Sequence, residues 1–173
     1  MIVEPYKLRR WKLKCSSERV QFFTCARPGR SKGACVRVAH QIVEKWLQGL
    51  QRIACGTEIA IISLLGRKHG PEGDSEFWFY SFHGAWDLPA ERRGRLSFQQ
   101  WLDRWHKDMG IRVIECPTYD FYPVPPDVLR AVASEVSHFL SEGLTVILID
   151  SGGETRTRQV CKHMAFVEDT RTA

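Results

Sequence analysis

The segment from Leu144 to Thr157 reads LTVILIDSGGETRT, and it decides how we expect the chain to fold. Its first six residues are apolar apart from one threonine, and such a run is typical of a strand with both sheet faces covered. The Asp-Ser-Gly-Gly stretch at 150–153 ends the strand, and a helix is predicted from about Thr157 to Phe166. This order can bind an anion, because loop N–H groups can turn inward at the positive end of a helix dipole.

Outside this segment, apolar strands alternate with amphipathic helices. Strands are predicted at Val20–Ala26, Glu58–Leu65, Phe77–Phe82 and Ile111–Glu115, and helices at Val36–Ile53, Ser97–Gly110 and Pro126–Ser141. The first helix is expected to bury a face formed by Val38, Ile42, Trp46, Leu47 and Leu50. The alternation favours the α/β class, with three layers and a mostly parallel central sheet flanked by helices. Because sites in such sheets form at the carboxyl ends of strands, the end of the 144–149 strand is the first candidate.

The length of 173 residues suits one domain. We expect that domain at 20–173, preceded by a basic N-terminal arm at 1–19 that frays in solvent. The tail Val167–Ala173 is expected to fray as well. The formal net charge of +5 favours anionic partners, either phosphate groups or nucleic acid, without choosing between them.

Location and cofactors can be predicted only in outline. The sequence has no apolar run near the roughly 18 residues that a membrane span needs. Met1–Lys14 lacks the apolar core of a signal peptide, so a cytoplasmic location is expected. The six cysteines form no Cys-x-x-Cys pair, and we interpret them as reduced thiols. The six histidines show no metal spacing, so neither a metal nor another cofactor is expected.

The same segment resembles the phosphate loop of the cysteine-dependent protein tyrosine and dual-specificity phosphatases. In that family the loop follows a hydrophobic strand and reads His-Cys, five residues, Arg, then Ser or Thr. The matching positions are Ser151, Gly152, Gly153, Arg156 and Thr157. Two positions depart from the pattern, because Ile149 stands where the family has His and Asp150 stands where it has the nucleophilic Cys.

The resemblance implies roles for residues of this chain. Asp150 occupies the nucleophile position, Arg156 would grip the phosphoryl group, and Thr157 would place a hydroxyl beside it. Residues 151–156, which include Glu154 and Thr155, would line the phosphate site. The proline-rich loop Pro117–Pro126 resembles the loop that carries the family's general acid, which would be Asp120. The alternative for Asp120 is a turn-forming residue, and Asp87 is a weaker rival for the acid.

An aspartate in the loop changes the expected chemistry. A carboxylate is normally ionised at pH 7 and is a weaker nucleophile than a thiolate here. At about 4 Å and an effective dielectric constant of about 20, each pair of like unit charges costs about 4 kcal/mol, or roughly a thousandfold in affinity. Glu154 would add to this repulsion if it pointed inward. Either protonation of Asp150, or a carboxylate that fills the loop and pairs with Arg156, would relieve it.

The sequence leaves three functions open. The first is a pseudophosphatase that binds a protein or a phosphate-bearing ligand without turnover. The second is an active phosphatase in which Asp150 is an engineered or unusual replacement of Cys. The third is a nucleic-acid-binding module that uses the basic N-terminal arm. The aromatic stretch Phe77–Tyr80 is compatible with base stacking but more often marks a strand with one buried face.

Overall fold

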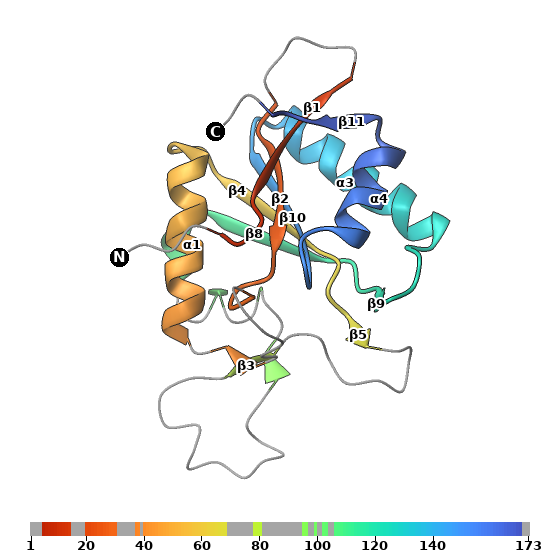
Figure 1. Ribbon diagram of the computed structural model, residues 1–173. Helices are drawn as coiled ribbons and strands as arrows, with labels where there is room; N and C mark the ends of the chain where they lie inside the picture. The colour runs from red at the N-terminus through yellow and green to blue at the C-terminus, as the bar shows by residue number, and fades with distance from the viewer. Residues whose placement is uncertain are drawn as a thin grey trace.

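A computed structural model of the chain describes residues 5–14, 20–30, 37–38, 40–68, 78–80, 95–96, 99, 102–103 and 106–170. Its centre is a mixed six-stranded sheet (Figure 1). The strands, in their order across the sheet, are β11 (Phe166–Glu168), β1 (Arg9–Leu13), β2 (Phe22–Ala26), β10 (Thr145–Asp150), β4 (Ile59–Ser63) and β8 (Ile111–Glu115). The four strands from β2 to β8 are mutually parallel, whereas β1 pairs antiparallel with both of its neighbours. The expected mostly parallel α/β sheet is therefore confirmed.

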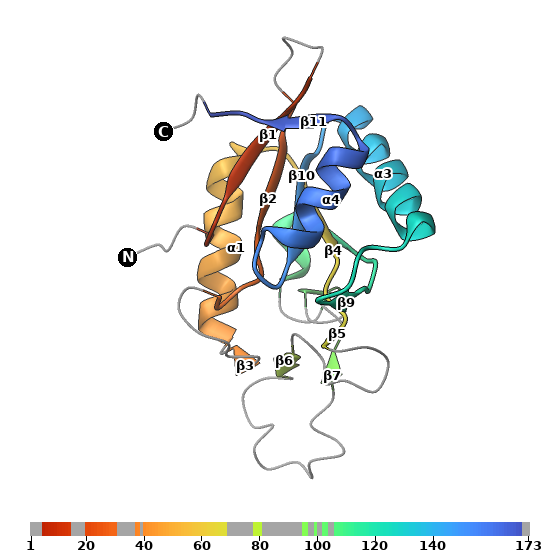
Figure 2. The same cartoon turned by 45° about the vertical axis from the view of Figure 1, so that its right-hand side comes forward.

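Helices cover both faces of the sheet, as Figures 1 and 2 show. Helix α1 (His40–Ala54) packs on one face, and α3 (Pro126–Ser141) and α4 (Thr155–His163) pack on the other. Alternate residues of β10 enter the two cores, because successive strand side chains point to opposite faces. Ile147 and Ile149 lie in the cluster with α1, while Val146 and Leu148 lie in the cluster with α3 and α4. This two-sided burial explains why β10 is apolar along its whole length.

The predicted face of the first helix was wrong at two positions. Ile42 is 46% exposed, and Val43 is buried in its place. Val38 belongs to the short strand β3 (Arg37–Val38) and not to the helix. The buried face of α1 consists of Val43, Trp46, Leu47, Leu50 and Ala54. These positions have the regular spacing of one helix face. The centre of that face lies about 100° around the helix from Ile42.

Residues 9–13 and 166–168 enter the sheet, which corrects the predicted arm and tail at these positions. Strand β1 lies within the segment expected to be a frayed N-terminal arm, and β11 overlaps the tail expected to fray. The two strands pair with each other, with Trp11 opposite Glu168. The indole of Trp11 is buried and donates a hydrogen bond of 2.9 Å to Thr24 on β2. The last helix correspondingly ends at His163, because the chain must turn back to form β11.

Two smaller sheets lie outside the main one. Strands β3, β6 (Trp78–Tyr80) and β7 (Arg95–Leu96) form the first, with β6 in the middle. Strands β5 (Arg67–Lys68) and β9 (Tyr119–Asp120) form the second. Of the helix predicted at Ser97–Gly110, residues 99, 102 and 103 are helical and the rest up to 105 lies outside the described residues. A short 3-10 helix, η2 (Lys107–Met109), precedes Gly110.

The described part of the chain contains no helix that combines the length and apolarity needed to cross a membrane. Asp87 and the side chains of the aromatic stretch lie outside the described residues, so these two predictions stay predictions.

The loop after β10 is pressed against the backbone of β2 at Gly153. This glycine has φ of +70°, and a Cβ placed on it would overlap the backbone N of Ala26 and lie 2.6 Å from the carbonyl carbon of Cys25. Both atoms belong to the backbone of β2, which is held by its pairing with β10 and by the hydrogen bond from Ala26 N to Tyr6 O. Gly152, its neighbour, faces open space, and a Cβ added there would meet no atom within 4 Å.

The two glycines should therefore respond differently to the same substitution. We expect Gly153→Ala to lower the free energy of unfolding by about 3 kcal/mol or more, because it combines a left-handed backbone with a backbone overlap. Gly152→Ala is the matched control and should change it by less than about 1 kcal/mol. Urea denaturation of both variants measures the difference. Equal effects would show that the loop does not approach β2 as described.

Candidate functional site

The candidate site lies at the carboxyl end of β10, where three parallel strands end together. Asp150 is the last residue of β10, and its backbone carbonyl accepts a hydrogen bond of 2.9 Å from Arg27 N, just beyond β2. On the other side, Leu64 N, just beyond β4, donates to Ile149 O at 2.9 Å. Residues 151–154 form the bends that lead into α4. The sheet thus fixes the place from which the side chain of residue 150 emerges.

The Asp150 carboxylate fills the loop. Its Oδ1 accepts hydrogen bonds from Gly153 N and, at 3.3 Å, from Glu154 N. Its Oδ2 accepts from Arg156 N at 2.9 Å and from Thr157 N at 3.0 Å. The residue is 1% exposed, so these four donors replace the water that an ionised carboxylate would otherwise need.

This arrangement is an anion-binding cradle that holds an anion of its own chain. Two of the four amides belong to the first turn of α4, whose free N–H groups and dipole favour a negative charge. Helix α4 has no side-chain cap at its N-cap residue, Glu154, and the Asp150 carboxylate caps it from further upstream. The side chain of Asp150 thus fills the loop, which is one part of an arrangement considered from the sequence.

The guanidinium of Arg156 binds on the other side of the site. It donates to Leu64 O at 3.2 Å and to Thr118 Oγ1 at 3.1 Å, and its NH2 lies 3.3 Å from Asp120 Oδ1. The side chain is almost fully buried. The contact between Arg156 and Asp150 is a hydrogen bond from the backbone N–H of Arg156. Its guanidinium ties the end of β4 to the loop that carries Asp120.

Asp120 lies beside the guanidinium of Arg156. It belongs to β9, its side chain is 21% exposed, and its carboxylate also accepts a hydrogen bond of 3.2 Å from Phe121 N. Phe121 has φ of +69°, so the chain turns sharply after Asp120. The structure thus brings Asp120 to Arg156, although 36 positions separate them in the sequence.

Glu154 points away from the cradle, which removes the extra repulsion considered from the sequence. Its carboxylate binds Lys7 Nζ at 2.6 Å and Arg9 NH2 at 2.9 Å. The hydrogen bond from Lys7 lowers the pKa of Glu154 below its ordinary value, and the charges of Lys7 and Arg9 add to this effect. These pairs therefore stabilise the fold above the ordinary carboxyl pKa, and they are lost as the pH falls through the lower folded value.

The remaining predicted residues occupy distinct positions around the loop. Ser151 and Thr157 are buried, Gly152 is half-buried, and Thr155 is exposed at the first position of α4. The Thr157 hydroxyl is buried and has no hydrogen-bond partner within the part of the chain that the structure describes.

Two of the described thiols, Cys25 and Cys161, are buried. Cys25 lies beside the loop but is fully buried, and its burial raises the pKa of the thiol, with the negative charge of Asp150 raising it further. Burial likewise raises the pKa of Cys161, which packs in the core with α3 and α4. Both thiols are therefore neutral near pH 7. Among the described residues, no three His, Cys, Asp or Glu side chains gather as metal ligands would.

Sequence reasoning missed three residues that organise the site. Thr118 is buried, accepts from Arg156 and donates to Leu64 O at 2.6 Å. Lys7 and Arg9, from the N-terminal segment, hold Glu154 outward. A threonine beside a proline-rich turn and two cations in a basic stretch carry no pattern that distinguishes them, because their partners are remote in the sequence.

The sequence matches no protein-family model and no curated protein. Solved structures with a similar fold were found. The kinase associated phosphatase, in a form whose catalytic-site cysteine is replaced by serine, matches with a TM-score of 0.54 and 15% identity over 93% of this chain and 73% of that chain. Tk-PTP in its active form gives a TM-score of 0.44 and 14% identity over 83% of this chain. This chain thus spans 65% of the length of that Tk-PTP chain.

The likeness to the kinase associated phosphatase shows that this chain has a phosphatase-like fold. At this level of identity, the fold is what the two proteins share. What the cradle does in this chain has to be argued from its own residues.

Neutralising the resident carboxylate should destabilise the protein. We expect Asp150→Asn to lower the free energy of unfolding by about 2–4 kcal/mol, because an amide keeps the shape but loses the charge and turns an NH2 group toward buried donors. Asp127→Asn, in the exposed first turn of α3, is the matched control and should cost less than about 1 kcal/mol. Guanidinium denaturation compares them. If Asp150→Asn left the free energy of unfolding unchanged, the described hydrogen bonding would be contradicted.

Proposed function

We propose that this chain is a pseudophosphatase, a phosphatase-fold protein that recognises a partner without hydrolysing a phosphate ester. The observation that carries the proposal is the cradle filled by Asp150, with four backbone amides bound to one buried carboxylate. The basis for calling it phosphatase-related is the fold and the resemblance of residues 145–157 to the phosphate loop.

Space and charge both disfavour a phosphate in the cradle. A carboxylate extends one bond further from the backbone than the sulfur of a cysteine, so its oxygens occupy the region that a bound oxyanion would fill. An incoming phosphate dianion would have to displace Asp150 from its four donors or bind against its charge. At about 4 kcal/mol for each like-charge pair, the second route weakens binding roughly a thousandfold.

The position of Asp150 also makes it a poor nucleophile. Both of its oxygens accept hydrogen bonds from amides that are fixed by the sheet and by α4. Attack on phosphorus would require an oxygen to leave these donors, and the donors would then be buried without a partner. Donors that bind the ground-state carboxylate this well oppose its attack instead of assisting it.

The side chains of Arg156 and Asp120 contact each other. In the phosphatases that the loop resembles, the arginine stabilises the phosphoryl group and the aspartate protonates the leaving oxygen. Here the two side chains pair at 3.3 Å, and the guanidinium is also bound to Thr118 and Leu64 O. These contacts support a structural role for the pair, in which it closes the site beside the filled cradle.

The test is a hydrolysis assay on a small aryl phosphate with three forms of the full chain. We expect the natural chain and Asp150→Ser to show no turnover above background. Asp150→Cys supplies a thiol among amides that lower its pKa, and it should exceed the natural chain by at least about a hundredfold. Turnover by the natural chain equal to that of Asp150→Cys would overturn the proposal and favour an active phosphatase that uses Asp150.

A second prediction tests whether the Asp150 side chain occupies the anion site of the loop. Asp150→Ser removes the resident charge and should let the cradle bind inorganic phosphate, so that its melting temperature rises with phosphate concentration. At a hundredfold excess over Kd, the stabilisation would be about 2.7 kcal/mol. The natural chain should gain much less, and sodium chloride at equal ionic strength is the control for screening. If phosphate stabilises both forms equally, Asp150 does not occupy the anion site.

A further inference from the structure

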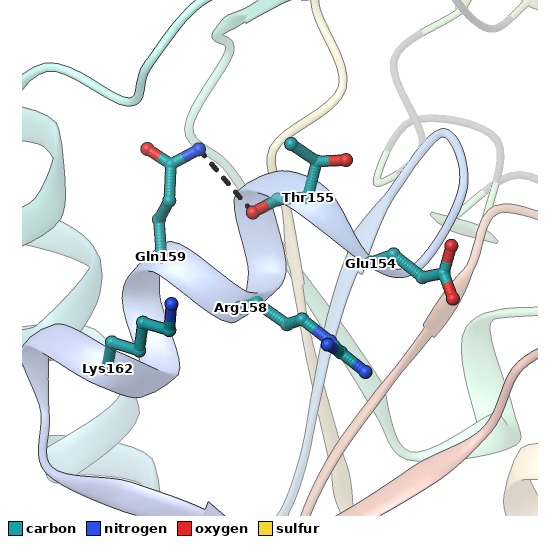
Figure 3. Close-up of a pocket in the computed structure, with 5 residues that line it drawn as sticks. All are labelled: Glu154, Thr155, Arg158, Gln159 and Lys162. Atoms are coloured by element: carbon teal, nitrogen blue, oxygen red, sulfur yellow. Dashed lines mark hydrogen bonds between the residues drawn. The ribbon is translucent and has the colours of Figure 1, made fainter.

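A hollow of about 380 Å³ lies on the outer side of α4, next to the cradle but separate from it. Its lining residues are Glu154, Thr155, Arg158, Gln159 and Lys162 (Figure 3). Figure 3 shows Arg158 extending in the direction of Glu154, with Lys162 below Gln159. The volume falls within the range of small-ligand sites.

The charge of this hollow is positive. Arg158 and Lys162 lie four residues apart and so share one face of α4. Lys162 is exposed and forms no ion pair with any described carboxylate, while Arg158 has only a long contact of 3.7 Å to Glu168. The one carboxylate in the lining, Glu154, is already bound by Lys7 and Arg9 and therefore does not cancel the two cations.

The walls of the hollow are held by hydrogen bonds. Gln159 Nε2 donates to Thr155 O at 3.4 Å, and Gln159 Oε1 accepts from Val124 N at 2.9 Å. The second bond attaches the proline-rich loop to the edge of the hollow. That loop presents three exposed aromatic side chains, which are Tyr119 at 41%, Phe121 at 74% and Tyr122 at 51% exposure. A basic hollow and an apolar surface thus adjoin through Gln159.

We propose that this hollow binds the phosphate monoester of a phosphorylated protein segment, whose neighbouring side chains pack on the aromatic loop. The inference rests on the proposed function, because the Asp150 carboxylate fills the cradle and leaves recognition of the phosphate to the cations outside it. Arg158 offers a planar fork of donors and Lys162 a compact charge, and both bind phosphate oxygens well.

The distribution of charge favours a single phosphate over a polyanion. Arg158 and Lys162 are two cations on one face of a single helix, whereas a nucleic acid needs a basic stripe that follows its evenly spaced phosphates. One phosphate can reach Arg158 and Lys162 alone. The strand β1, which lies within the sheet, also removes part of the basic arm on which nucleic-acid binding was predicted to depend.

The experiment is a titration of the isotope-labelled full chain, followed by the backbone amide signals in NMR spectra. The probes are a short phenylalanine- and alanine-flanked peptide with one phosphotyrosine, its phosphoserine analogue, the unphosphorylated peptide and a single-stranded oligonucleotide. We expect a phosphopeptide to shift signals at 154–162 and at 119–124, and the unphosphorylated peptide to shift none.

Two double variants test whether the phosphopeptide binds in the hollow. Arg158→Gln with Lys162→Gln should raise the Kd for the phosphopeptide at least about tenfold. Lys45→Gln with Arg52→Gln makes the same charge change at exposed positions of α1, on the other face of the sheet, and should leave the Kd within about twofold. Thermal unfolding checks that both forms fold. A Kd that both pairs change equally would overturn the assignment to the hollow.

The remaining outcomes separate this inference from the proposed function. Shifts confined to 150–157 and insensitive to the Arg158 and Lys162 changes would place the phosphate in the cradle and overturn the inference. Absence of phosphopeptide binding at millimolar concentration, or tighter binding of the oligonucleotide at the same residues, would overturn it as well. Release of free phosphate from the peptide, followed by phosphorus NMR in the same tube, would instead overturn the pseudophosphatase proposal.

Discussion

The site depends on one interaction, the binding of the Asp150 carboxylate by backbone amides of its own loop. A strand that ends at a helix N-terminus leaves several N–H groups without partners, and burial makes each of them costly. Here a single carboxylate satisfies four of them and places its charge at the positive end of α4. The loop therefore needs no external ligand to keep its shape, whereas an empty cradle of this kind would need water or an anion.

The other charged residues of the site are arranged around the loop that Asp150 fills. The contacts of the buried Arg156 guanidinium beside the filled cradle include Asp120, Thr118 and the carbonyl of Leu64 at the end of β4. Glu154, the other acidic residue of the loop, is drawn outward by Lys7 and Arg9. Two carboxylates are thus kept apart on the two sides of a short loop. Arg158 and Lys162, which line the hollow proposed to bind a phosphate, lie on the outer side of α4.

The sequence predicted the elements whose signals are local. The apolar run of β10 and the proline and glycine that bound α3 placed these elements nearly at their observed limits. Strands β1 and β11 are short and rich in charge, and they form because each covers an edge that only the folded sheet presents. Likewise Asp150 and Arg156 stand out in a local pattern, while Thr118 and Lys7 act through partners far along the chain. Their roles could not be derived without coordinates.

The most direct test of the filled cradle is a crystal structure of the natural chain grown in a high concentration of sulfate or vanadate. We expect both Asp150 oxygens to lie within hydrogen-bond distance of the loop amides, with no oxyanion inside residues 151–156. An oxyanion bound by those amides, with the Asp150 side chain swung out of the loop and the Arg156 guanidinium turned toward the ion, would contradict this expectation.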